Sequence, residues 1–210
     1  GTDSLCGGSP ALVKYELDGI DFGFTYDGHA LVQENVIQNV RCTDTDYNYL
    51  EAIYFWDGNA DIIGNIIGHP TDSAKGLFFA SGSSNSLWVV EANGENANLE
   101  GNIGANIHYK TGDFYGYEIY SDSGYASGNK IYACGPDSNG GGYEITGLNY
   151  EGGNIYGTYK MYNNMISLSG NSDVPFYGIW NESDVNRMEA YYNTVYLGGS
   201  DSTEYSYAFY

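Results

Sequence analysis

Six copies of one short motif constrain the fold of this 210-residue chain more than any other feature. In each copy an asparagine, usually preceded by a small or polar residue, leads into an apolar run. Successive asparagines are 27 to 37 residues apart, and they are Asn35, Asn65, Asn102, Asn129, Asn164 and Asn193. A repeat of this length indicates a solenoid or an array, because one unit cannot bury its apolar face alone.

A second element follows each asparagine after 11 to 17 residues: a small residue that leads into an aromatic strand. Its six copies begin at Ala52, Gly76, Gly116, Gly142, Gly178 and Ala208. Both elements are rich in Ile, Val, Tyr and Phe and are interrupted by Gly, Asn, Asp and Ser, which favours strands over helices. A β-sandwich is the alternative, but a sandwich has no reason to keep the two elements in phase.

Asparagine suits a tight bend between two strands, because it tolerates left-handed backbone angles and its amide can bond to neighbouring backbone. If the coils stack, the six asparagines should form a ladder in which each amide bonds to the next. We therefore expect an all-β chain built as a stack of coils.

The asparagine motif followed by a glycine-led strand resembles the right-handed parallel β-helix of the pectate-lyase-like superfamily. The stretches MYNNMISLSG with FYGIWNES, and YYNTVYLGGSDSTEYSYAFY, are similar to β-helical repeats of large bacterial cell-surface proteins. The resemblance covers about residues 19–210 and leaves residues 1–18 as an N-terminal lead or cap. It implies a parallel β-helix of about seven coils, a fold that hosts lyases, hydrolases, adhesins and fibre proteins alike.

The strand pattern also predicts which side chains fill the core. The expected inward residues are Ile53, Phe55, Ile66, Leu77, Phe79, Ile103, Ile119, Ile131, Ile145, Ile166, Ile179 and Val195. Their alternate neighbours should point outward. Many of the 23 tyrosines are among these neighbours, so we expect an aromatic outer surface suited to other chains or to sugars.

The charge is strongly acidic, with 27 Asp and Glu against 7 Lys and Arg and a net charge of −20. Nucleic acid is excluded as a natural partner, because phosphate contacts need clustered Lys and Arg. An anionic membrane surface is disfavoured for the same reason, and no apolar run approaches the roughly 18 residues that span a bilayer. The chain begins at Gly1 without a signal segment, which indicates a processed product or a segment of a longer protein.

The three cysteines do not have the spacing of a zinc site. Cys6 and Cys42 are 36 residues apart, about one coil, so a disulfide between them is as plausible as two separate thiols. Such a bridge would suit an extracellular protein. Cys134 lies some three coils further on and should be unpaired.

Acidic turns are candidate calcium sites, because oxygen ligands at alternate positions can converge on one ion. The candidates are Asp44, Asp46, Asn48, Asp57, Asn59 and Asp61. The alternative is that each is an ordinary solvated turn. We expect no other cofactor.

The sequence favours a protein without enzymatic activity. The histidines are isolated, and the serines lack a nucleophile elbow. The resemblance to polysaccharide lyases implies a basic catalytic residue, but the seven basic residues are scattered. Glycoside hydrolysis needs only two carboxylates about 5–9.5 Å apart, which the abundant acidic residues leave open.

We therefore expect an extracellular or cell-surface structural protein that assembles head-to-tail with copies of itself into a filament. An open β-helix end presents unpaired backbone and apolar side chains to another strand. The expected interface residues are Leu12, Phe22 and Phe24 at one end and Tyr205, Tyr207 and Phe209 at the other. The alternatives are an adhesin module that binds polysaccharide and a carbohydrate-active enzyme, either a polysaccharide lyase or a glycoside hydrolase.

Overall fold

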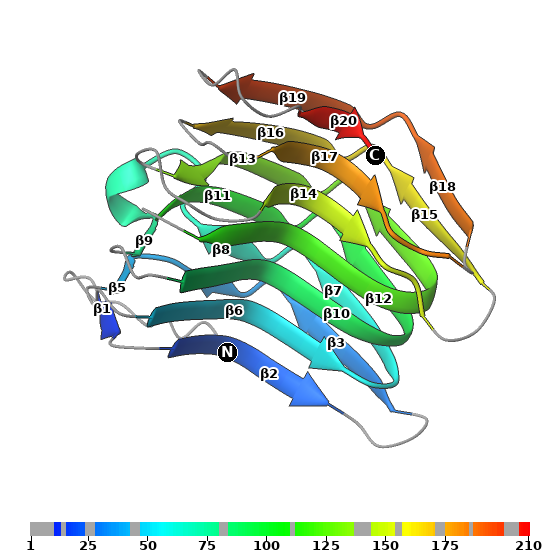
Figure 1. The fold of residues 1–210 in the computed structure, drawn as a ribbon. Coiled ribbons are helices and arrows are strands. Elements are labelled where there is room, and N and C mark those ends of the chain that lie inside the picture. The colour runs from blue at the N-terminus through cyan, green and yellow to red at the C-terminus, as the bar shows by residue number, and fades with distance from the viewer. Residues whose placement is uncertain are drawn as a thin grey trace.

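The chain forms a parallel β-helix of about five turns (Figure 1). The computed structural model describes residues 11–13, 16–23, 28–42, 47–79, 84–109, 112–136, 144–153, 157–170, 175–184, 187–199 and 206–210. The predicted all-β solenoid is confirmed. The turn count is lower than the seven expected, because the six asparagine corners delimit five turns.

Sheet A forms one side of the solenoid, and its nine strands run in the order β1-β5-β9-β11-β13-β16-β19, with β4 and β8 beside this path. They are β1 (Ala11–Val13), β4 (Val36–Ile37), β5 (Val40–Cys42), β8 (Ile66–Gly68), β9 (Leu77–Phe79), β11 (Ile103–Tyr109), β13 (Lys130–Pro136), β16 (Met165–Gly170) and β19 (Thr194–Gly199). A short 3-10 helix, η1 (Ser73–Lys75), precedes β9.

Sheet B has eleven strands in the order β2-β6-β10-β12-β14-β17-β20, with β3, β7, β15 and β18 beside this path. They are β2 (Glu16–Gly23), β3 (His29–Gln33), β6 (Tyr47–Trp56), β7 (Asn59–Ile63), β10 (Ser84–Glu100), β12 (Asp113–Ser127), β14 (Ile145–Tyr150), β15 (Thr158–Tyr162), β17 (Phe176–Asn181), β18 (Arg187–Tyr191) and β20 (Tyr207–Phe209).

Sheet B is bent into two parts. Residues 84–93 of β10 pair with β6, whereas residues 96–100 pair with β7. We call β2, β6, β14, β17, β20 and the first halves of β10 and β12 the front part, and β3, β7, β15, β18 and the second halves the side part (Figure 1). All pairings among the described strands are parallel, so each coil adds one rung to every side.

Strand pairing begins earlier than the expected boundary at residue 19. Strand β1 pairs with β5, so that Ala11 lies opposite Val40. Strand β2 pairs with β6, so that Glu16 lies opposite Tyr49. Residues 11–13 and 16–18 therefore belong to the solenoid and not to a separate lead.

The six repeat asparagines lie in one continuous ladder at the corner between the side part and sheet A. In the middle of it, Asn65 Nδ2 donates to Asn102 Oδ1 at 2.9 Å, and Asn102 Nδ2 donates to Asn129 Oδ1 at 2.9 Å. The same relation links Asn35 to Asn65, Asn129 to Asn164 and Asn164 to Asn193. Each of the last five amides also donates to a main-chain carbonyl of the preceding coil, at Val32, Ile62, Leu99, Ala126 and Met161.

The left-handed backbone at this corner belongs to the residue before each asparagine, not to the asparagine itself. These six residues are Glu34, Gly64, Gly101, Gly128, Asn163 and Tyr192, with φ between 55° and 64°. The expected reason for asparagine at the corner was therefore only half right. The preceding residue makes the bend, and the asparagine turns its amide inward, where the ladder satisfies it.

We expect Asn102→Ala to lower the free energy of unfolding by about 1–3 kcal/mol, because buried groups that bond to its amide would lose their partner. These groups are the main-chain N–H and the amide of Asn65 and the carbonyl of Ile62. Urea denaturation measures the change. The exposed corner residue Glu100 supplies a control in Glu100→Gln, and an Asn102 variant as stable as that control would contradict a structural ladder.

A second prediction concerns the free-energy cost of the left-handed backbone at this corner. A Cβ at Gly101 would meet no atom within 4 Å, and the residue has a φ of 64°. Gly101→Ala should therefore cost about 1–2 kcal/mol through left-handed strain alone. Tyr192, with a φ of 57°, offers the reverse change, and Tyr192→Gly should be neutral or stabilising in the same denaturation assay. Equal effects of the two changes would show that the corner does not require this conformation.

The core lies between the two sheets, and nine of the twelve predicted residues are fully buried in it: Ile53, Phe55, Leu77, Phe79, Ile119, Ile131, Ile145, Ile166 and Ile179. Val195 is partly buried against them. The prediction was wrong for Ile66 and Ile103, which are only half-buried. Each directly follows an inward asparagine, so strand alternation turns it outward and turns the next residue inward.

A column of small residues lines the inner side of the front part. Added Cβ atoms at Gly116 and Gly147 would collide with the carbonyl oxygens of Gly147 and Gly178. Four predicted starts of the second element, at Ala52, Gly116, Gly178 and Ala208, lie in front-part strands. Gly76 instead precedes β9 of sheet A, and Gly142 lies outside the described residues.

Tyrosines occupy both the core and the surface. Tyr109, Tyr117, Tyr150 and Tyr159 are fully buried. The hydroxyl of Tyr117 donates to the Asn102 carbonyl at 3.0 Å. Tyr191, Tyr192, Tyr196, Tyr207 and Tyr210 are exposed and form part of the expected aromatic surface.

Candidate functional site

The front part of sheet B presents three columns of side chains on its outer surface, which we call the front face. Each column runs across β6, β10 and β12. The first column is Glu51, Trp88 and Tyr115, the second is Tyr54, Glu91 and Glu118, and the third is Trp56, Asn93 and Tyr120. Columns two and three are two residues apart along each strand, the normal outward period. Between columns one and two the chain has two successive buried residues, such as Ala52 and Ile53, so those columns are three residues apart.

The centre of the front face is a group of glutamates. Glu91 and Glu118 are direct partners across β10 and β12, and the side chain of Glu51 is hydrogen-bonded to that of Glu91. Glu118 accepts a short hydrogen bond from Trp88 Nε1, and Asn149 Nδ2 lies 3.4 Å from its Oε1. The stacking of β10 and β12 therefore holds Glu91 and Glu118 one rung apart, about 4.8 Å.

This arrangement raises the pKa of the central carboxyls. Burial raises the pKa of Glu91 to about 8, with further contributions from repulsion by Glu118 and Glu51. Burial raises the pKa of Glu118 to about 7, although hydrogen bonds from Trp88 and Asn149 act in the opposite direction. Both carboxyls can therefore carry a proton near neutral pH, which limits the repulsion between them.

The raised pKa values predict a pH-dependent stability. In the unfolded chain these glutamates titrate near 4.5, so their protons are bound more tightly in the folded state. Their contribution is complete below about pH 4.5 and is lost as pH rises through 7 and 8. Glu91→Gln imitates the protonated acid and should raise the unfolding free energy at pH 8.5 by about 1–3 kcal/mol, with little effect at pH 4.5.

Chemical denaturation at both pH values tests this expectation. Glu95→Gln is the matched control, because Glu95 is an exposed residue of the same strand. A control that matches Glu91→Gln in its pH dependence would show that the net charge of −20, and not the buried group, governs the effect.

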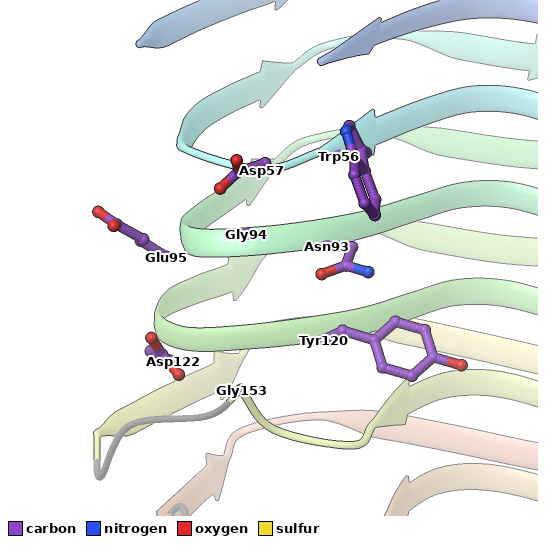
Figure 2. Close-up of a pocket in the computed structure, with 8 residues that line it drawn as sticks. All are labelled: Trp56, Asp57, Asn93, Gly94, Glu95, Tyr120, Asp122 and Gly153. Carbon is purple, nitrogen blue, oxygen red and sulfur yellow. The ribbon is translucent and has the colours of Figure 1, made fainter. Parts of the chain in front are cut away.

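A surface pocket with a volume of about 340 Å³ adjoins the third column. Figure 2 shows Trp56, Asn93 and Tyr120 on successive strands, with three acidic residues at the neighbouring bends. The lining residues are Trp56, Asp57, Asn93, Gly94, Glu95, Tyr120, Asp122 and Gly153. The Trp56 side chain is 55% exposed, whereas a hydrogen bond to Glu151 holds the Tyr120 hydroxyl.

The described basic residues lie away from the front face. Arg41 and Lys130 are on sheet A, and Lys75 is in η1. Lys160 and Arg187 are on the side part, in β15 and β18. In the part of the chain that the structure describes, the front part therefore contains acidic residues without a basic one.

The candidate calcium residues are only partly placed. Asp44 and Asp46 lie outside the described residues, as does the side chain of Asn48. Asp61 accepts from Asn98 Nδ2 at 2.8 Å and lies 3.0 Å from His29 Nε2, so both of its oxygens are engaged. Asp57 and Asn59 precede it at the bend and in β7, and the described residues include no group of three or more His, Cys, Asp or Glu placed to hold a metal ion.

The cysteines give no nucleophile among the described residues. Cys6 lies outside them, so a bridge to Cys42 stays a prediction, and Cys42 is buried in β5. Cys134 is a free thiol, as expected. It is buried beside the carbonyls of Gly104 and Tyr132, and burial raises its pKa to about 12.

The residues expected at the two assembly ends lie at opposite ends of the stack (Figure 1). Leu12 is in β1, and Phe22 in β2 packs against Phe55 with 5.2 Å between ring centroids. Tyr207 and Phe209 are exposed on β20, which pairs with β17. Phe24 and Tyr205 lie outside the described residues.

The sequence did not indicate the front face as a site. Counted forward from the preceding ladder residue, Glu91 lies 26 residues after Asn65 and Glu118 lies 16 residues after Asn102, so they do not align. Counted back from the next ladder residue they do align, because each lies 11 residues before an asparagine, Asn102 or Asn129. The signal that relates them is therefore the constant distance to the following asparagine, and the strand register of β10 and β12 agrees with it.

Comparison with known proteins yields no match to a family model, to a curated protein or to a solved structure. In the described ranges no helix is long and apolar enough to cross a membrane.

Proposed function

We propose that the chain is an extracellular β-helical module that binds carbohydrate on the front face. The observation that carries the proposal is the exposed Trp56 beside a polar pocket, with Asn93 and Tyr120 in register on the next two strands. A sugar ring offers an apolar C–H face and a rim of hydroxyls. It therefore fits a site that combines an aromatic surface with a few polar groups.

The rest of the front face extends this site along the strands. Trp88 and Tyr115 stack with 5.3 Å between their ring centroids, on the far side of the Glu91 and Glu118 column. A linear oligosaccharide lying along the strands would contact aromatic rings at both ends and carboxyl groups between them. The resemblance to repeats of cell-surface proteins supports the extracellular assignment.

The proposal predicts that Trp56→Ala weakens oligosaccharide binding at least about tenfold, because truncating an exposed aromatic anchor removes most of its contact energy. Titration calorimetry should use a panel of neutral, amino and uronic-acid oligosaccharides. Tyr196→Ala is the control, since Tyr196 is 63% exposed but lies on sheet A. Failure of all oligosaccharides to bind, or equal losses in both variants, would overturn the proposal.

Glycoside hydrolysis is a second candidate, supported by one observation. The Glu91 and Glu118 carboxyls are neighbours and have pKa values near 8 and 7, as a general acid at neutral pH requires. Release of reducing ends during the binding experiments, abolished in Glu118→Gln, would favour the enzyme over the binding module.

Head-to-tail assembly into a filament stays a separate proposal. Tyr207, Phe209 and Tyr210 expose aromatic surface on the last described strand and its end. A second copy of the chain or a following coil of a longer protein would cover this surface equally well.

A further inference from the structure

We propose that the Trp56 pocket takes a glycan with protonated amino groups, that is, an oligomer of a deacetylated amino sugar. This inference rests on the proposed function, because it names the class of sugar for the same face. Its starting point is the chemistry of the pocket lining, which combines aromatic and acidic side chains and includes no basic one.

The acidic side chains come from three successive coils. Asp57 follows β6, and Glu95 and Asp122 lie within β10 and β12. Figure 2 shows these three side chains at the strand bends, with the rings of Trp56 and Tyr120 on the other side of the pocket. An ammonium group in the pocket could contact a carboxylate and an aromatic face together.

Both kinds of group favour a cation. Carboxylates accept charge-assisted hydrogen bonds from ammonium groups, and the face of a tryptophan ring attracts a cation. Asn93 lies between Trp56 and Tyr120 in the same column and offers both a donor and an acceptor to sugar hydroxyls (Figure 2). The site is therefore suited to a ligand that carries hydroxyl and ammonium groups on one ring.

The spatial arrangement distinguishes this ligand from a metal ion. The described residues include no group of three or more His, Cys, Asp or Glu placed to hold a metal ion. The pocket carboxylates are spread over three rungs, each about 4.8 Å apart, which matches charges distributed along an oligomer. A uronic-acid oligomer would instead meet carboxylates of its own sign.

No basic side chain lines the pocket. Among the described residues, the basic side chains lie on other parts of the solenoid. Asp57 adopts a left-handed φ of 69°, where asparagine is tolerated at least as well as aspartate. A change of Asp57 to Asn therefore removes charge without disturbing the bend.

The test is titration calorimetry with three oligomers of equal length: glucosamine, N-acetylglucosamine and galacturonate. The glucosamine oligomer should bind at least about tenfold more tightly than the acetylated one. The double variant Asp57→Asn with Glu95→Gln should lose most of that preference, about three- to fivefold for each carboxylate removed. Raising salt from about 0.05 to about 0.3 M should weaken only the amino-sugar complex.

The matched control is the double variant Glu34→Gln with Glu100→Gln, which removes two exposed acids near the asparagine corner. An equal loss in this control would show diffuse attraction to the net charge and would overturn the inference. Equal binding of the acetylated oligomer, lost in Trp56→Ala, would overturn the amino-sugar assignment but leave glycan binding intact. If none of the three oligomers binds, both proposals fail.

Discussion

The asparagine ladder is the interaction on which the rest of the structure depends. Each central amide bonds in three coils at once: Asn102 accepts from Asn65, donates to Asn129 and donates to the carbonyl of Ile62. Because these groups are buried, a coil that slipped by one residue would leave several of them without a partner. The ladder therefore fixes the position of each coil on its neighbours, and this sets the register of the strands that adjoin it.

A fixed register also brings side chains of like charge together on the outer surface. Equivalent positions of successive coils lie one rung apart, so two acidic residues at the same position of successive coils become neighbours. Glu91 and Glu118 are such a pair, and burial raises the pKa of both carboxyls, which favours their uncharged form. The same stacking aligns Trp56, Asn93 and Tyr120, so the crowding of acids and the aromatic pocket have one origin.

The sequence was informative where the signal is local and uninformative where it depends on pairing between coils. The ladder could be predicted because every copy carries the same residue in the same local pattern. Ile66 and Ile103 were wrongly predicted to point inward. The sequence pattern does not show which of the two residues after the asparagine points into the core. Gly76 was misassigned because glycine-led aromatic strands occur in both sheets. The glutamate pair was missed because each coil was counted forward from its asparagine, across segments of different length, and not back from the next asparagine.

Basic residues on the other parts of the solenoid form ion pairs with acidic ones, and this distinguishes those parts from the front face. Near η1, Lys75 lies 3.5 Å from Asp72, and on the side part Arg187 lies 3.0 Å from Glu189. Such local compensation lowers the repulsion that a net charge of −20 imposes. The described residues of the front part include no Lys or Arg, and Glu118 is held there by hydrogen bonds from Trp88 and Asn149. Because the pocket beside the exposed Trp56 belongs to this face, an ammonium-bearing ligand of the kind proposed would bring the opposite charge to it.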